Sequence, residues 1–131
     1  MKRIVIVACK KAREQHFCPG DAKCLVAMMR RVGEFERYKD EDASIIAIVE
    51  CGECPGTRVA GSLGLLKTQL VALNETPDVI HVASCVMALC AYKDDLINLI
   101  KEKAGIEVVE GTHKYAKPKI FEPKHVEVKV D

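Results

Sequence analysis

The chain has 131 residues and a mass of 14.5 kDa, and its 20 Lys and Arg residues against 19 Asp and Glu leave a formal net charge of +1. This near neutrality, with no Trp and only three Tyr and three Phe, argues against the basic surface and the aromatic platforms typical of nucleic-acid binding. No apolar run approaches the ~18 residues of a membrane span, and the N-terminal apolar stretch lacks a signal-peptide cleavage pattern, so we expect one cytoplasmic domain over residues 1–131 that binds neither nucleic acid nor membrane.

The hydrophobic pattern alternates between strand-like runs and helical stripes. Residues 3–9 form a run rich in β-branched side chains, and apolar residues then recur at helical spacing from Leu25 to Phe35. The alternation continues with a strand over 44–50, a helix over 59–73, a strand over 79–83, a helix over 94–104 and a strand over 106–110. Because apolar runs of this kind suit strands covered on both faces, the pattern predicts an α/β fold with a mainly parallel sheet in the flavodoxin-like order 2-1-3-4.

The last segment, residues 111–131, differs from the rest in being rich in lysine. Its alternating Val126, Val128 and Val130 are typical of an edge strand, and lysines are typical of a solvated edge. We expect this basic tail to add an edge strand or to lie in solvent, and we assign it no function.

Cysteines follow three of the predicted strands. Cys9 ends the first strand, Cys51 ends the second and Cys85 follows the third. In an open parallel sheet, ligands bind in the crevice outside the carboxyl ends of the strands. With the order 2-1-3-4 these three residues lie on neighbouring strands about 4.8 Å apart, so we expect their thiolates to converge on one metal ion.

Cys51 and Cys54 form a C-x-x-C pair, the spacing at which two thiolates from one turn chelate one ion. Gly52 permits a tight turn, and the helix start beside Arg58 is expected to lower the pKa of the nearby thiols. The same motif is also typical of a thioredoxin-like redox pair, but the five further cysteines favour a metal site over a simple dithiol.

The other candidate ligands have less informative surroundings. Cys18 lies in the first loop, while Cys24 and Cys90 lie among apolar residues, where a free cysteine is commonly core filler. His113 follows a strand end and is either a ligand or a plain loop residue, whereas His81 inside a strand is expected to be a core histidine.

Together these motifs resemble the CGGC-domain family, small prokaryotic proteins described as metal-binding because of their cysteines and a histidine. The matching stretches are Val7-Ala8-Cys9, Cys18-Pro19-Gly20, Cys24, Cys51-Gly52-Glu53-Cys54-Pro55-Gly56, Val82-Ala83-Ser84-Cys85, Cys90 and Thr112-His113. The sequence has Glu53 where the namesake motif has a second glycine, and Ala91-Tyr92-Lys93 where the family has Pro-His. The resemblance implies metal binding and implies no particular reaction.

The sequence therefore predicts a protein that holds a metal ion, preferably zinc, at the carboxyl edge of its sheet. Cys51 and Cys54 are the expected central pair, completed by Cys9 and Cys85. Four thiolates would make the site structural, whereas three beside His113 would leave a position for an activated water.

Three alternatives stay open. An iron–sulfur cluster is also held by cysteine thiolates. A redox or sulfur-transfer enzyme would use Cys51 or Cys54 as its nucleophile. An α/β scaffold with buried cysteines would act through a partner surface instead.

Overall fold

A computed structural model describes residues 1–14, 18, 20–52, 54, 56 and 58–114, which form four strands and six helices. In chain order these are β1 (Lys2–Ala8), α1 (Lys10–Glu14), α2 (Ala22–Arg30), the 3-10 helix η1 (Gly33–Tyr38), β2 (Ala43–Glu50), α3 (Val59–Val71), β3 (Val79–Val82), α4 (Ser84–Leu89), α5 (Lys93–Ala104) and β4 (Glu107–Glu110). The edge strand expected around Val126 to Val130 lies outside the described residues. No helix in the described part reaches the length and hydropathy that a membrane span requires.

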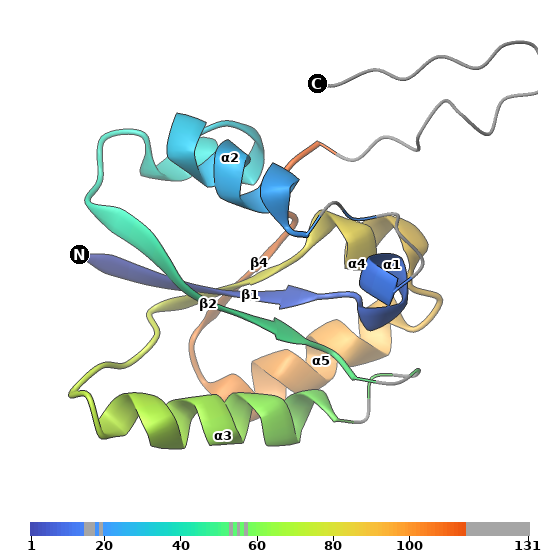
Figure 1. Cartoon of the computed structure of the whole chain (residues 1–131). Helices are drawn as coiled ribbons and strands as arrows, with labels where there is room; N and C mark the ends of the chain where they lie inside the picture. The colour runs from blue at the N-terminus through green and yellow to red at the C-terminus, as the bar shows by residue number, and fades with distance from the viewer. Residues whose placement is uncertain (15–17, 19, 53, 55, 57, 115–131) are drawn as a thin grey trace, which may run out of the picture.

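The four strands form one parallel sheet in the order β2-β1-β3-β4, which confirms the predicted fold class and strand order. The chain moves one way from β1 to β2 and the opposite way from β2 to β3 and β4. Right-handed crossovers therefore place α2 and η1 on one face of the sheet and α3 and α5 on the other, as Figure 1 shows. The short helices α1 and α4 lie beyond the carboxyl ends of β1 and β3 (Figure 1).

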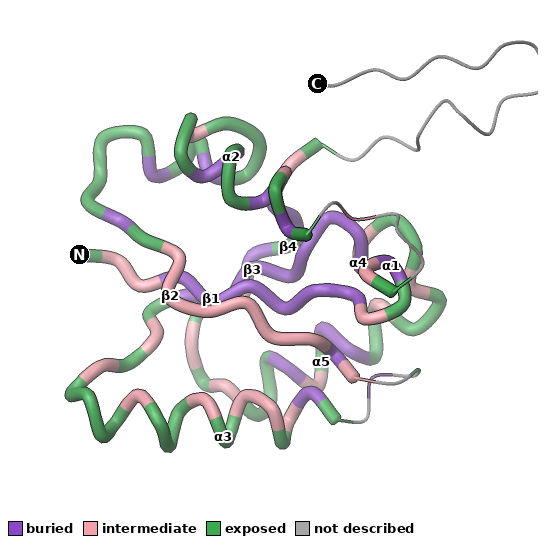
Figure 2. The backbone as a smooth tube through the Cα atoms, viewed as in Figure 1, coloured by how far each residue is buried: buried purple, intermediate pink, exposed green. Residues whose placement is uncertain are grey.

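The central strand β1 carries the core. Its residues Ile4 to Val7 are completely buried, because helices cover both faces of this strand. The edge strand β2 is only half-buried over residues 45–50. Figure 2 shows this difference between the two neighbouring strands. The apolar run over residues 3–9 therefore predicted a strand covered on both faces correctly, whereas the similar run over 44–50 forms an edge strand that is covered less completely.

The helix expected from Leu25 to Phe35 is divided into two elements. Helix α2 ends at Arg30, and Arg31 has a φ of 54°. The Arg31 guanidinium donates hydrogen bonds to the carbonyl oxygens of Met28 (2.7 Å) and Tyr38 (3.1 Å), which holds the chain reversal.

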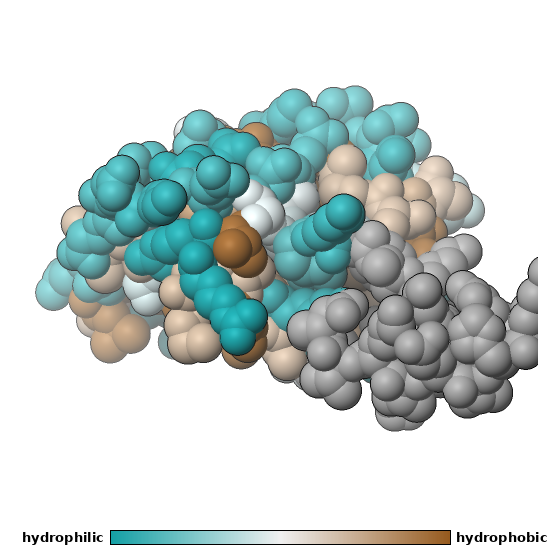
Figure 3. Space-filling model, turned by 90° about the horizontal axis from the view of Figure 1, so that it is seen from above, coloured by the Kyte–Doolittle hydropathy of each residue, from teal (hydrophilic) through white to brown (hydrophobic). Residues whose placement is uncertain are grey.

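Only part of the predicted apolar stripe is buried. Met28 and Phe35 are buried, whereas Leu25, Met29 and Val32 are 47%, 73% and 49% exposed. The expectation of one continuous apolar face was wrong for two reasons. Within α2 the buried side chains are Cys24, Ala27 and Met28, so Leu25 and Met29 lie outside the buried face, and beyond α2 the helical period does not continue through Arg31. Seen from the side of α2, the described surface is largely hydrophilic with separate hydrophobic spots (Figure 3).

His81, in β3, is a core histidine, as its position inside a strand predicted. Its side chain is fully buried; Nδ1 lies 2.9 Å from the carbonyl oxygen of Gly111, and Nε2 lies 2.7 Å from the hydroxyl of Tyr38. The carbonyl can only accept, so Nδ1 donates to Gly111 and Nε2 accepts from Tyr38. Burial lowers the pKa of His81 below its ordinary value of 6.5.

Candidate functional site

The carboxyl ends of β1, β2 and β3 bring three cysteines to one edge of the sheet. The backbone N–H of Cys51, directly after β2, donates to the carbonyl oxygen of Ala8 at 3.0 Å. The backbone N–H of Cys9 donates to Sγ of Cys85 at 3.3 Å. Residues separated by up to 76 positions in the sequence are therefore neighbours because their strands are adjacent.

A pocket of about 430 Å³ opens beside these strand ends. Four cysteines line it: Cys9, Cys51, Cys54 and Cys90. The rest of its wall is largely apolar and includes Val86, Leu89, Tyr92 and Leu96, with Lys11 as the charged member. The pocket thus collects four cysteines from three separate segments within a mainly apolar surrounding.

Two glycines shape the loop that carries the C-x-x-C pair. Gly52 has a φ of 84°, and a Cβ there would lie 2.6 Å from Cβ of Arg58. Gly56 has a φ of 89°, and a Cβ there would lie 2.9 Å from Cδ1 of Leu96. Both the backbone conformation and the close approach require glycine. In this loop Cys51 is buried and Cys54 is exposed.

Burial raises the pKa of two of the pocket thiols, those of Cys51 and Cys90. For Cys51, burial is the main cause, and the nearby thiols of Cys9, Cys90 and Cys54 raise the pKa further. A hydrogen bond from the backbone N–H of Lys10 acts in the opposite direction and lowers the pKa. Burial likewise raises the pKa of Cys90. The expectation that the helix start and Arg58 lower the pKa was therefore wrong for Cys51, because desolvation outweighs them and Arg58 is exposed.

The other three cysteines lie outside this pocket. Sγ of Cys24 lies 3.3 Å from Oγ1 of Thr112, and Sγ of Cys18 accepts the backbone N–H of Asp21 at 3.3 Å. Burial is the main cause that raises the pKa of Cys85 to about 11, and the neighbouring thiols of Cys9, Cys24 and Cys18 also raise it. Burial raises the pKa of Cys24 as well.

The seven cysteines thus form two groups of three, a pocket group and an inner group, and Cys9 contacts both. The pocket group contains Cys51, Cys54 and Cys90, and the inner group contains Cys18, Cys24 and Cys85. Cys9 lines the pocket and donates its backbone N–H to Sγ of Cys85. The sequence had favoured Cys85 as a partner of the C-x-x-C pair, and the structure places Cys90 in the same pocket as that pair.

The turn after β4 holds a buried side-chain contact that the sequence did not predict. His113 is half-buried and is not among the residues that line the cysteine pocket, and its Nδ1 lies 2.9 Å from the carbonyl oxygen of Lys114. Its neighbour Thr112 is fully buried, and Oγ1 of Thr112 accepts the backbone N–H of Ser84 at 3.1 Å. The available signal was a threonine two residues after the end of a predicted strand.

Among the described residues, no three His, Cys, Asp or Glu side chains are set close enough together to hold a metal ion in this conformation. The thiols are directed at backbone groups instead: Sγ of Cys51 donates to the carbonyl oxygen of Gly52 at 3.6 Å, and Sγ of Cys85 accepts from Cys9. The expected convergence of Cys9, Cys51 and Cys85 thus brings the residues together without aiming their sulfurs at one point. The metal-ligand roles of the seven cysteines and His113 stay predictions.

Comparison with known proteins places these motifs in a family. A family model described as the CGGC domain matches residues 3–113. Over 122 residues the chain is 35% identical to the uncharacterized protein MJ0582 of Methanocaldococcus jannaschii, with 88% of this chain and 89% of that protein covered. No solved structure matches the chain. The cysteine-rich α/β chain belongs to the CGGC domain family.

Proposed function

We propose that the protein binds one soft metal ion, zinc, through the thiolates of Cys9, Cys51, Cys54 and Cys90. The observation that carries this proposal is the gathering of these four cysteines around one pocket. Thiolate sulfur is a soft ligand that zinc accepts in four-coordinate sites, with Zn–S distances of about 2.3 Å. The donor set therefore fits zinc in its chemistry and its number.

The raised pKa values of Cys51 and Cys90 are consistent with a site that is completed by a cation. Without a cation, each thiolate formed in the pocket disfavours the next one, which is why the neighbouring sulfurs raise the pKa of Cys51. A bound cation reverses this effect and deprotonates the coordinating thiols. Binding also has to rotate the thiol of Cys51 away from its present partner, the carbonyl oxygen of Gly52.

Metal analysis of protein purified without oxygen tests the proposal. We expect about one zinc per chain in colourless protein, and loss of that zinc in Cys51→Ser and Cys54→Ser. The matched control is Cys24→Ser, because Cys24 is a buried cysteine of the inner group and lies outside the pocket. Retained zinc in both pocket variants, or its loss in the control alone, would contradict the proposed ligand set. A brown protein with broad visible absorbance would replace zinc by an iron–sulfur cluster.

Thiol–disulfide exchange is a second candidate function, favoured by the unequal exposure of the C-x-x-C pair. Cys54 is exposed at the pocket and Cys51 is buried behind it. In such an exchange the Cys54 thiolate would attack an external disulfide and release one thiol. Cys51 would then displace the second thiol and leave a Cys51–Cys54 disulfide.

Alkylation separates the two functions. Ligation predicts that Cys54 of zinc-loaded protein reacts slowly with iodoacetamide until a chelator is added. Rapid labelling of Cys54 with zinc still bound would favour exchange chemistry.

A further inference from the structure

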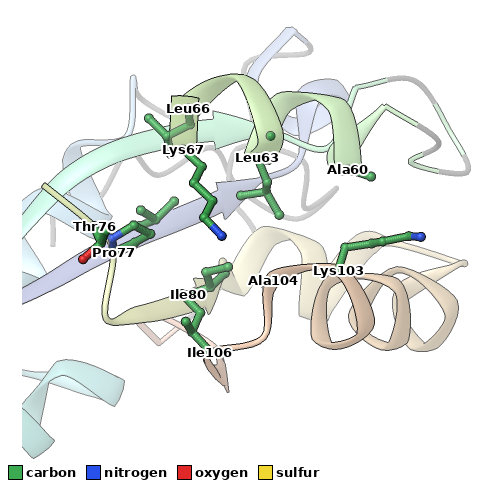
Figure 4. A pocket seen from close by; sticks show the side chains of 12 residues that line it. Ala60, Leu63, Leu66, Lys67, Thr76, Pro77, Ile80, Lys103, Ala104 and Ile106 are labelled. Atoms are coloured by element: carbon green, nitrogen blue, oxygen red, sulfur yellow. The ribbon is translucent and has the colours of Figure 1, made fainter. Parts of the chain in front are cut away.

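A second cavity lies between α3, α5 and the sheet, away from the cysteine pocket, and has no role in the proposed metal site. Its volume is about 450 Å³; α3, the end of α5 and the sheet form its walls, and it is partly open to solvent. Val5 and Ile80, which are buried core residues of β1 and β3, are part of its lining. Figure 4 shows Leu63 and Ile80 facing each other across this space. The cavity shares no lining residue with the cysteine pocket.

The lining of this cavity is mainly apolar. Leu63 and Leu66 contribute from α3, Ala104 ends α5, and Ile106 precedes β4. Protein interiors are close-packed and contain few voids larger than a water molecule, whereas pockets for small organic ligands measure about 300–1,000 Å³. Water in this pocket meets few polar partners among the lining residues, so an apolar ligand gains free energy by displacing it. The apolar lining therefore favours a hydrocarbon group as the occupant.

The charge at the cavity is positive. Lys67 of α3 directs its ammonium group into the space between the helix and the sheet, while Lys103 of α5 points away from it (Figure 4). No Asp or Glu is among the lining residues. Neither lysine forms an ion pair within the part of the chain that the structure describes. Lys67 is exposed, so its ammonium group is accessible to an anionic group of a ligand in the cavity.

We propose that this cavity binds an amphipathic monoanion, an acyl chain that ends in a carboxylate. The chain would lie against Leu63, Leu66 and Ile80, and the carboxylate would pair with Nζ of Lys67. The apolar lining supplies most of the binding free energy, and the ammonium group selects an anionic headgroup over a neutral one. This inference is independent of the metal proposal, because it concerns residues on other parts of α3, α5 and the sheet.

Two glycines of α3 provide a matched pair of variants for the cavity. A Cβ at Gly64 or at Gly61 meets no heavy atom within 4 Å, and only Gly64 lines the cavity. Leucine has a higher helix propensity than glycine, so neither Gly64→Leu nor Gly61→Leu is expected to unfold the helix. The first fills the cavity and the second leaves it open.

Calorimetric titration of the full chain with decanoate and, separately, decan-1-ol tests the proposal. We expect one decanoate per chain, with binding weakened at least about tenfold by Gly64→Leu and altered less than about twofold by Gly61→Leu. Lys67→Met should weaken decanoate binding about threefold to fivefold and leave decanol binding unchanged, while Lys103→Met should leave both unchanged. Absence of decanoate binding at millimolar concentration, equal binding by Gly64→Leu and the unmodified chain, or equal affinity for the alcohol and the carboxylate would each overturn the proposal. Zinc content is the same in every one of these outcomes, so failure here is distinct from failure of the metal site.

Discussion

A single hydroxyl group connects the cysteine-bearing segments to the end of the sheet. Oγ1 of Thr112 accepts the N–H of Ser84 and lies 3.3 Å from Sγ of Cys24, while the N–H of Thr112 donates to Oγ of Ser84 at 3.0 Å. Ser84 in turn donates its hydroxyl to the carbonyl oxygen of His113. Through these bonds the turn after β4 holds the start of α4, which carries Cys85, and the side chain of Cys24.

Thr112→Val is expected to destabilise the protein, because valine matches the shape of threonine but lacks the hydroxyl. The buried N–H of Ser84 then loses its acceptor, which costs about 1–3 kcal/mol in the free energy of unfolding. Urea denaturation followed by circular dichroism measures this change. Thr68→Val is the matched control, since Thr68 is exposed on α3 and the change there should stay within about 0.5 kcal/mol. Equal stability of the two variants would show that the Thr112 hydroxyl has no structural role.

At the scale of elements, η1 is attached to the turn after β4 through backbone contact. The N–H of Glu34 donates to the carbonyl oxygen of Thr112 at 2.9 Å. Gly33 has a φ of 63°, and a Cβ there would lie 2.6 Å from that same carbonyl oxygen. This approach brings Phe35 and Tyr38 of η1 against His81 in the core, with ring centroids 4.9 Å and 5.6 Å from the imidazole.

Gly33→Ala is therefore expected to cost more stability than an alanine placed at a similar φ in open space. Gly105, which ends α5, has a φ of 66° and nothing within 4 Å of an added Cβ. Gly105→Ala should cost about 1–2 kcal/mol for the left-handed conformation alone. Gly33→Ala adds the clash with the carbonyl oxygen of Thr112, so its melting temperature should fall further. If both variants melt at the same temperature, the η1 contact does not constrain Gly33.

At the scale of the whole molecule, the topology could be predicted from the sequence because the four apolar runs are strands and the residues between them carry helical signals. Gly105, for example, ends α5 in the left-handed conformation, as its position after the predicted helix indicated. The short helices α1 and α4 were missed, since five and six residues are too few to show a helical period.

The position of the candidate site could be predicted from the sequence, but which cysteines lie together in its pocket could not. Strand order alone placed Cys9, Cys51 and Cys85 at one edge. Which of the more distant thiols join the pocket depends on the direction of α4, which carries the chain from Cys85 to Cys90, and a sequence pattern does not encode that direction. The acidity of Cys51 could not be predicted because it depends on burial, which exists only in the folded chain.

The buried His81 makes the stability of the whole molecule depend on pH. Its pKa is lowered in the folded state, chiefly by burial, so below about pH 6.5 the unfolded chain binds a proton that the folded chain does not. The free energy of unfolding should therefore fall as the pH decreases from about 7.5 to 5.5, by at most about 1.4 kcal/mol per pH unit from this group. Carboxylates contribute little in this range, because their ordinary pKa values lie near 4. Urea unfolding across the range should show a flatter pH dependence for His81→Gln, whose side chain cannot gain a proton, even if that variant is less stable throughout. An equally steep decline in both proteins would assign the pH dependence to groups other than His81.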